Sequence, residues 1–245
     1  MSREFRSEES TASTPKIIVA IDGPAGAGKS TIARHLARHF GLLNLETGAM
    51  YRAFALKVLR TGLALDDSGA ADFERLAGET ILHLVPTAGE NRVFLDGEDV
   101  TAQLRNPTVT DAASRVSVFP AIRAWMVRLQ QQMAAGGGVV MEGRDIGTVV
   151  FPHAEVKIFL DAAPEVRGMR RFEQIGASQT GVKAERQPEE VIRELRERDK
   201  RDRNRADSPL KPAEDAVLLD STNMTLEEVV KAAERIVEEK LASLA

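Results

Sequence analysis

Nine residues near the N-terminus have the types and the order of a loop that binds phosphate groups. They are Gly23, Pro24, Ala25, Gly26, Ala27, Gly28, Lys29, Ser30 and Thr31. The glycines let the backbone curl so that successive N–H groups point at one anion. The amine of Lys29 can reach the β- and γ-phosphates of a nucleoside triphosphate, and the hydroxyl of Ser30 can ligate Mg²⁺. A glycine-rich turn that binds nothing is the alternative, and the flanking residues decide between the two.

The residues on either side of this loop fit a strand that enters it and a helix that leaves it. The run 17–22 is short and apolar, as in a buried parallel strand. After the loop, Ile32, Leu36 and Phe40 fall on one helical face, opposite a polar face. The N-terminus of that helix adds partial positive charge where phosphates would lie. A strand, a glycine-rich loop and a helix in this order predict a site for a nucleoside triphosphate.

Four more short apolar runs predict four more strands. They cover Leu42–Glu46, Gly138–Glu142, Val156–Asp161 and Ala216–Ser221. Helix-like segments separate them, and this alternation predicts an α/β fold with a five-stranded parallel sheet and helices on both faces. Polar clusters stand at the ends of three runs, at 46–48, 142–145 and 220–221. Because ligands of such sheets lie at the carboxyl ends of the strands, we expect these clusters to share one site.

Two stretches interrupt this alternation. Within 71–107, the runs 80–86 and 92–95 alternate like antiparallel strands, which predicts a small inserted β subdomain. One long helix is expected to follow, from Asp111 to about Ala135, and to end at three consecutive glycines. The polar stretch 174–187 stands between charged helices and is a candidate lid, with a plain surface loop as the alternative.

The densest charge in the sequence is the run 196–205. On a helix, Arg198, Asp202 and Arg205 share one face. Solvated ion pairs are the ordinary explanation for such a run. Its position after the candidate lid favours a cationic face that encloses a phosphoryl group in transfer, because that chemistry depends on neutralising charge.

A second cationic group stands at the start of the second predicted helix. Arg52 follows Thr47 and Tyr51 there. A hydroxyl, an aromatic ring and a guanidinium at a helix N-terminus suit a phosphate-bearing acceptor that carries a base or ribose. Core packing would equally explain the tyrosine.

Two histidines have the spacing of metal ligands. His35 and His39 are four residues apart on the polar face of the first predicted helix. The sequence places no third ligand near them and lacks the His-Glu dipeptide of zinc proteases. We expect no metal site there, and Ser30 is the residue expected to bind metal.

The composition is that of an ordinary globular protein. With 245 residues and a net charge of −4, the chain can bury one large core and is a poor general binder of nucleic acid or anionic membrane. The absence of cysteine excludes disulfides and thiolate metal sites, and no apolar run reaches membrane-spanning length. Residues 1–15 are rich in Ser, Thr and Glu and are predicted to be a disordered tail, so the predicted domain covers 16–245.

Several segments together closely resemble the bacterial cytidylate kinases, a family of P-loop nucleoside monophosphate kinases. They are the loop and the segments Leu45–Arg52, Phe94–Val100, Glu142–Pro152 and Glu197–Arg205. The inserted β segment and the Gly-Arg-Asp sequence at 143–145 separate this family from adenylate and guanylate kinases. The resemblance runs from about Lys16 to the C-terminus, and it implies that ATP, with Mg²⁺, phosphorylates CMP or dCMP in the cytoplasm.

The resemblance also implies a role for each candidate site residue. The nine loop residues hold ATP, with Arg167, Arg170 and Arg171 near the triphosphate. The residues around the phosphate of the acceptor are Thr47, Tyr51, Arg52, Arg144 and Arg205. Those that read its cytosine are Ser114, Arg123 and Asp145, and those that hold its ribose are Arg198 and Asp202. The groups expected to act on the phosphoryl group are Lys29, Arg144, Arg171 and Arg205. The chain departs from the family pattern at Glu46 and Glu142, where aspartate is expected; both keep the carboxylate and add a methylene.

Other functions fit the sequence less well. Another nucleoside monophosphate kinase, with mixed use of pyrimidines, is the alternative within the same class. A GTPase switch would need an Asn-Lys-x-Asp tetrapeptide, which is absent from the sequence. We expect small-molecule substrates, no nucleic-acid or membrane partner, and a monomer.

Overall fold

The computed structural model describes residues 16–85, 87, 91–178 and 187–244. The predicted tail 1–15 and most of the candidate lid, 179–186, lie outside these residues. No helix in the described part of the chain is both long and apolar enough to cross a membrane.

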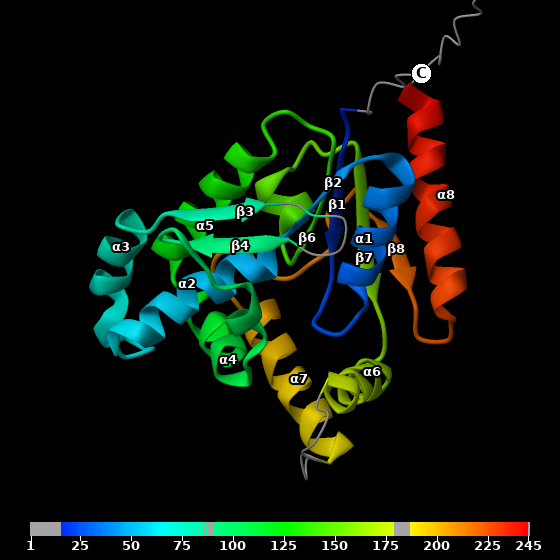
Figure 1. Ribbon diagram of the computed structural model, residues 1–245. Helices are drawn as coiled ribbons and strands as arrows, with labels where there is room; N and C mark the ends of the chain where they lie inside the picture. The colour runs from blue at the N-terminus through cyan, green and yellow to red at the C-terminus, as the bar shows by residue number, and fades with distance from the viewer. Residues whose placement is uncertain (1–15, 86, 88–90, 179–186, 245) are drawn as a thin grey trace, which may run out of the picture.

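A five-stranded parallel sheet forms the centre of the molecule (Figure 1). Its strands are β2 (Leu43–Glu46), β6 (Val139–Gly143), β1 (Ile18–Asp22), β7 (Val156–Asp161) and β8 (Val217–Asp220), in that spatial order. Every pair is parallel. The register places Ile21 and Glu46 beside Glu142, so that the strands end at one edge with their polar residues together. The predicted fold class is therefore confirmed.

Helices cover both faces of this sheet. On one face, α1 (Lys29–Phe40) and α8 (Leu226–Leu244) pack over β1, β7 and β8 through one buried cluster. On the other face, a short π-helix (Ile146–Val150) and the end of α5 (Pro120–Met133) cover β6 and β2. Apolar side chains on both sides explain why these strands appear in the sequence as nearly continuous apolar runs.

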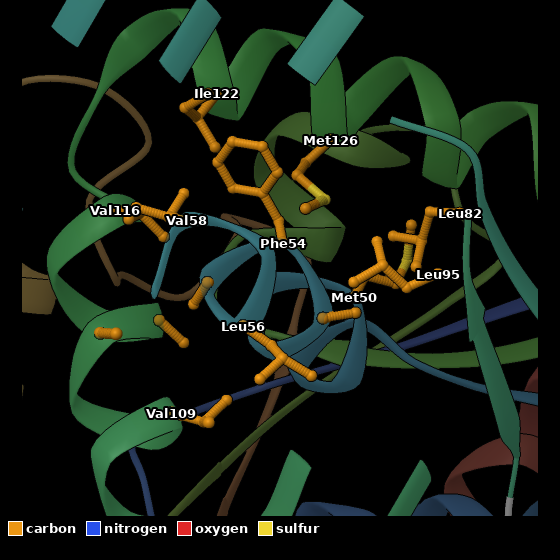
Figure 2. Packing of buried hydrophobic residues seen from close by; sticks show 14 of the residues in the cluster. Met50, Phe54, Leu56, Val58, Leu82, Leu95, Val109, Val116, Ile122 and Met126 are labelled. Carbon is orange, nitrogen blue, oxygen red and sulfur yellow. The ribbon is translucent and has the colours of Figure 1, made fainter. Parts of the chain in front are cut away.

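The largest core lies beside the sheet, around α2 (Thr47–Thr61). Met50, Phe54 and Val58 point from α2 into this core, and in Figure 2 the ring of Phe54 lies near Ile122 and Met126 of α5. The other walls are α3 (Ala70–Gly78), after the 3₁₀ turn Asp67–Gly69, and α4 (Pro107–Val116), after the 3₁₀ turn Thr101–Arg105.

A separate three-stranded antiparallel sheet occupies the predicted β insertion. It consists of β3 (Leu82–Val85), β4 (Arg92–Leu95) and β5 (Glu98–Asp99). Leu82 and Leu95 are buried against α2, so the small sheet packs on the helix that begins at the candidate acceptor cluster.

The prediction of one helix over 111–135 is wrong. The structure has two helices, α4 and α5, separated by the residues 117–119. Pro120 is the first residue of α5, where a missing N–H costs no hydrogen bond, and it disfavours a helical conformation at Phe119. Because of this break, Ser114 lies on α4 and Arg123 lies on α5, on either side of a corner between the two helices.

Two charged helices complete the fold below the sheet in Figure 1. They are α6 (Pro164–Ser178) and α7 (Pro188–Arg203), which pack against each other. Residues 174–178 of the candidate lid belong to α6.

Candidate active site

The glycine-rich loop connects β1 to α1 at the carboxyl edge of the sheet. Gly23 has a φ of +149°, and a Cβ there would lie 1.9 Å from the Leu160 carbonyl oxygen, so that no other residue fits. Lys29 is buried, and its Nζ donates to the Pro24 carbonyl oxygen at 2.7 Å. The amine thus lies over the curl of the loop, where a phosphate would meet it.

The charge state of Lys29 is finely balanced. Burial, followed by the nearby guanidinium of Arg144, lowers its pKa to about 7, while the carboxylate of Glu142 acts in the opposite direction. A bound phosphate would add negative charge beside the amine and favour its protonated form.

Asp22, the last residue of β1, joins the loop strand to the segment after β6. Its two carboxylate oxygens accept hydrogen bonds from the backbone N–H groups of Ile146 and Gly147, both at 2.7 Å. Burial raises the pKa of Asp22 to about 6, although these two bonds act to lower it. The sequence analysis missed this residue, since a strand-ending aspartate gives no local sign of a partner 124 residues away.

Two carboxylates, Glu46 and Glu142, stand side by side at the ends of neighbouring strands, and Glu142 is close to Ser30. Glu142 is buried, and burial followed by the charge of Glu46 raises its pKa, against the attraction of Lys29 and a hydrogen bond from Ser30. Its Oε1 has no hydrogen-bond partner among the described residues. Mg²⁺ prefers carboxylate, hydroxyl and water oxygens. A buried, unpartnered carboxylate oxygen beside the Ser30 hydroxyl therefore fits this ion.

The cluster at the start of α2 is anchored to the same edge. The hydroxyl of Thr47 donates to the Glu142 carbonyl oxygen at 2.7 Å. Arg52, one turn into the helix, forms an ion pair with Glu46. Tyr51 is half-buried, and burial raises the pKa of its phenol to about 12, while the charges that act on it most strongly are those of Arg123 and Asp145.

Asp202 on α7 contacts two arginines, one 58 residues before it and one three residues after it. It accepts from Arg144 Nε at 2.9 Å and pairs with Arg205. Arg198 is half-buried one turn before it on the same helix; burial and then the charge of Arg144 lower the pKa of Arg198 to about 10. The predicted helix face thus holds for Arg198 and Asp202, which lie on α7 near Arg144. The prediction that Arg205 shares this helix face is wrong, because α7 ends at Arg203 and Arg205 pairs with Asp202 from the segment that follows.

A second ion pair, buried, joins the two residues predicted to read the base. Arg123 pairs with Asp145 and donates to the Ser117 carbonyl oxygen at 3.2 Å. The hydroxyl of Ser114 is buried and has no partner among the described residues.

Ser117, which the sequence analysis missed, joins these groups. Its hydroxyl accepts from Arg205 Nη2 at 2.9 Å and donates to the Ser114 carbonyl oxygen, also at 2.9 Å. The break before Pro120 places this serine at the corner between α4 and α5.

The three arginines of α6 have different environments. Arg167 is fully buried and donates to Asp199 at 2.6 Å, to the Ala25 carbonyl oxygen at 2.9 Å and to the Ala162 carbonyl oxygen at 2.7 Å. Arg170 donates to the hydroxyl and the carbonyl oxygen of Ser221, at the end of β8. Arg171 is exposed. Arg167 therefore supports the loop from behind, through Ala25.

A phosphate loop at a sheet edge, with buried carboxylates and a cluster of arginines around it, defines a P-loop phosphotransferase. The cytidylate kinase family model matches residues 19–239. A cytidylate kinase of Pelotomaculum thermopropionicum is 52% identical over 87% of this chain and 92% of its own length. That of Actinobacillus succinogenes is 44% identical over 92% of this chain and 100% of its own. The chain belongs to the cytidylate kinase family.

One solved structure can also be aligned with this chain, at lower sequence identity. A shikimate kinase from Acinetobacter baumannii in complex with shikimate aligns over 94% of this chain and 96% of its own, at 17% identity and a TM-score of 0.43, a likeness too weak to bear on function.

Proposed function

We propose that this chain transfers the γ-phosphoryl group of ATP to CMP or dCMP and produces ADP with CDP or dCDP. The observation that carries the proposal is the pair of binding regions at one sheet edge. The loop and Lys29 form one region, and the buried Arg123–Asp145 pair forms the other. Asp22 joins them through its hydrogen bonds to Ile146 and Gly147.

On the ATP side, the proposed contacts come from the loop 23–31. Its backbone N–H groups and the amine of Lys29 hold the triphosphate. Arg167 acts through the Ala25 carbonyl oxygen that it holds. Arg170 and Arg171, on the same helix, are proposed to face the triphosphate. Ser30, with Glu46 and Glu142 around it, is proposed to hold Mg²⁺, which neutralises phosphate charge when bound.

On the acceptor side, each group has a complement in CMP. Arg52, Arg144 and Arg205, with Thr47 and Tyr51, are proposed to surround the phosphate, and Arg198 and Asp202 the ribose. Asp145 accepts from the exocyclic amine of cytosine, next to Arg123 and Ser114. Uracil would present an oxygen to the same carboxylate, and two buried acceptors would then face each other without a proton.

This acceptor requires no strong base. A phosphate monoester is largely ionised at neutral pH, so its oxygen attacks without losing a proton to the protein. Positioning and charge neutralisation then remain for the protein, which accounts for arginines rather than a histidine at the site.

We also propose a domain organisation. The tail 1–15 precedes a kinase domain over 16–245, the insertion 71–107 serves the acceptor side, and the segment 174–187 closes over the phosphates and excludes water. The small sheet of the insertion packs on α2, which begins at Thr47. We propose a monomer that works in the cytoplasm, where its nucleotide substrates are.

The test measures ADP formation with MgATP and each of CMP, dCMP, UMP, AMP and GMP in turn, with the Lys29→Ala protein as the blank for contaminating kinases. Formation of ADP should be fastest with CMP or dCMP. Preference for AMP or GMP, or equal ADP formation without an acceptor, would contradict the proposal.

A further inference from the structure

A cluster of two imidazoles and one carboxylate joins α1 to α8, away from the phosphate loop. Glu234 of α8 accepts from His35 Nε2 at 2.6 Å and lies 3.1 Å from His39 Nδ1, both through its Oε1. The two rings are stacked, with centroids 6.0 Å apart. Figure 1 shows α8 lying beside α1. The third ligand that the sequence did not place next to the histidine pair is thus supplied from 195 residues away.

The three side chains converge closely enough to share one ion. Their ligand atoms all lie within 4.8 Å of one another. In a tetrahedral zinc site with bonds of about 2.0–2.1 Å, ligand atoms are about 3.4 Å apart. The two contacts to Glu234 need to open by less than 1 Å, and the two imidazole nitrogens, at most 4.8 Å apart, need to close by no more than about 1.4 Å. Rotations of the two rings and the carboxylate supply both changes.

The donor types select the class of metal. Two imidazole nitrogens and one carboxylate suit Zn²⁺ and its neighbours, whereas Mg²⁺ prefers oxygen ligands alone. The side chains of His35 and His39 are 40% and 44% exposed, and that of Glu234 is 20% exposed, so an ion can enter from solvent. Lys231, one turn before Glu234, pairs with Glu227 at 2.6 Å.

We propose that His35, His39 and Glu234 bind one divalent transition metal ion of the Zn²⁺ class, with water as the fourth ligand. The ion takes the place of the hydrogen-bonding protons between the imidazoles and the carboxylate. Each neutral imidazole keeps its one proton on the ring nitrogen that faces away from the ion, and an imidazole that was doubly protonated releases its extra proton to solvent. It ties α8 to the helix that carries the phosphate loop at its other end. His35 and His39 follow Lys29 by six and ten residues, which is about 9–15 Å along a helix. The bound ion is therefore a structural clamp outside the phosphoryl-transfer site.

The test is a titration of Zn²⁺ into the full-length protein, followed by calorimetry, in millimolar Mg²⁺ that occupies the oxygen site near Ser30. The wild-type protein should bind one equivalent. The variants His35→Gln and Glu234→Gln should each lose about tenfold or more in affinity. The matched control is His153→Gln, which removes an exposed histidine outside the cluster and should bind as wild type does.

Two further measurements separate a clamp from a surface histidine that binds metal. Co²⁺ in place of Zn²⁺ should give the visible absorption bands of a four-coordinate site in wild type and not in His35→Gln. Zn²⁺ should slow amide hydrogen exchange along α8 in wild type alone. Circular dichroism and Mg²⁺-dependent kinase activity show that each variant is folded.

The proposal is overturned if wild type fails to bind Zn²⁺, or if His35→Gln and Glu234→Gln, folded, bind it as tightly as wild type. It is also overturned if His153→Gln loses the same affinity, or if binding leaves exchange along α8 unchanged.

Discussion

The two binding regions at the sheet edge are built in opposite ways. The proposed ATP side is a continuous run, 23–31, whose backbone N–H groups are proposed to do most of the binding. The acceptor side is assembled from five elements far apart in sequence, and its side chains are already engaged with one another: Arg123 with Asp145, Arg144 and Arg205 with Asp202. On the proposed assignment, ATP meets backbone donors, whereas the acceptor meets side chains that already form ion pairs with one another. We infer that the loop contributes affinity and rate, and that the acceptor network contributes selectivity.

The largest expected effect comes from the loop. Lys29→Ala removes the cation that meets charge growing in the transition state, and kcat should fall by about ten-thousandfold. Steady-state kinetics with CMP measures this. Thermal unfolding should show an intact fold, and Lys211→Ala, at an exposed lysine, should keep the wild-type rate. If Lys29→Ala kept nearly the full kcat, the assignment of residues 23–31 as the phosphate-binding loop would be wrong.

The next effect is on the stability of the fold, and it comes from Arg167, which contacts the loop at Ala25. Arg167→Ala leaves Asp199 buried without its partner and should lower the free energy of unfolding by about 3–5 kcal/mol. The matched control is Arg196→Ala, because Arg196 and Glu165 form a solvent-exposed ion pair that also joins α7 to α6. That change should cost about 1 kcal/mol or less. Urea unfolding that gives equal losses for both variants would show that Arg167 does not support the loop.

On the acceptor side, the effect should be on the choice of substrate. Asp145→Asn supplies a donor that can face the uracil oxygen, so the ratio of CMP to UMP activity, compared as kcat/KM, should fall by about two orders of magnitude or more. Arg123 loses its charge partner as well, so overall activity falls too. Asp111→Asn, at an exposed position on α4, is the control and should keep the ratio. An equal loss of kcat/KM for CMP and for UMP would mean that Asp145 acts on the phosphoryl group and does not read the base.

The smallest expected effect concerns Asp22, which joins the two regions. A carboxyl whose pKa rises from 3.8 to about 6 on folding binds protons more tightly in the folded state. The stability of the folded state must then rise as pH falls from about 6 towards 4. Relative to Asp22→Asn, wild type should gain about 1–3 kcal/mol between pH 7 and pH 4. Urea unfolding at several pH values measures the difference. A constant difference between the two proteins would mean that Asp22 has no raised pKa.

Local signals in the sequence predicted the fold and the position of the glycine-rich loop. The glycine spacing of 23–31 predicted the loop, and the five apolar runs predicted five strands within two residues of their ends. Their alternation with helices implied the shared carboxyl edge. Pro120 is the kind of residue that starts a helix, but the sequence analysis predicted a single helix across it, which is wrong.

Contacts between distant segments could not be predicted. Nothing near His35 indicates Glu234, and nothing in the charged run around Asp199 separates it from its solvent-exposed neighbours. The arginines of α6 look alike in sequence, yet Arg167 is buried and Arg171 is exposed. Tertiary packing determines which of several similar charged side chains is buried, and the sequence around each of them does not indicate which one it will be.

The guanidinium of Arg167 connects three parts of the molecule. One side chain holds the loop at Ala25, the end of β7 at Ala162 and the helix α7 at Asp199. A swing of α7 relative to the sheet must either break a desolvated charge pair or carry the loop with it. The helix α7 also carries Arg198 and Asp202. We therefore infer that the helix proposed to meet the acceptor and the loop proposed to hold ATP are connected through Arg167, so that acceptor binding can alter the backbone geometry of the loop.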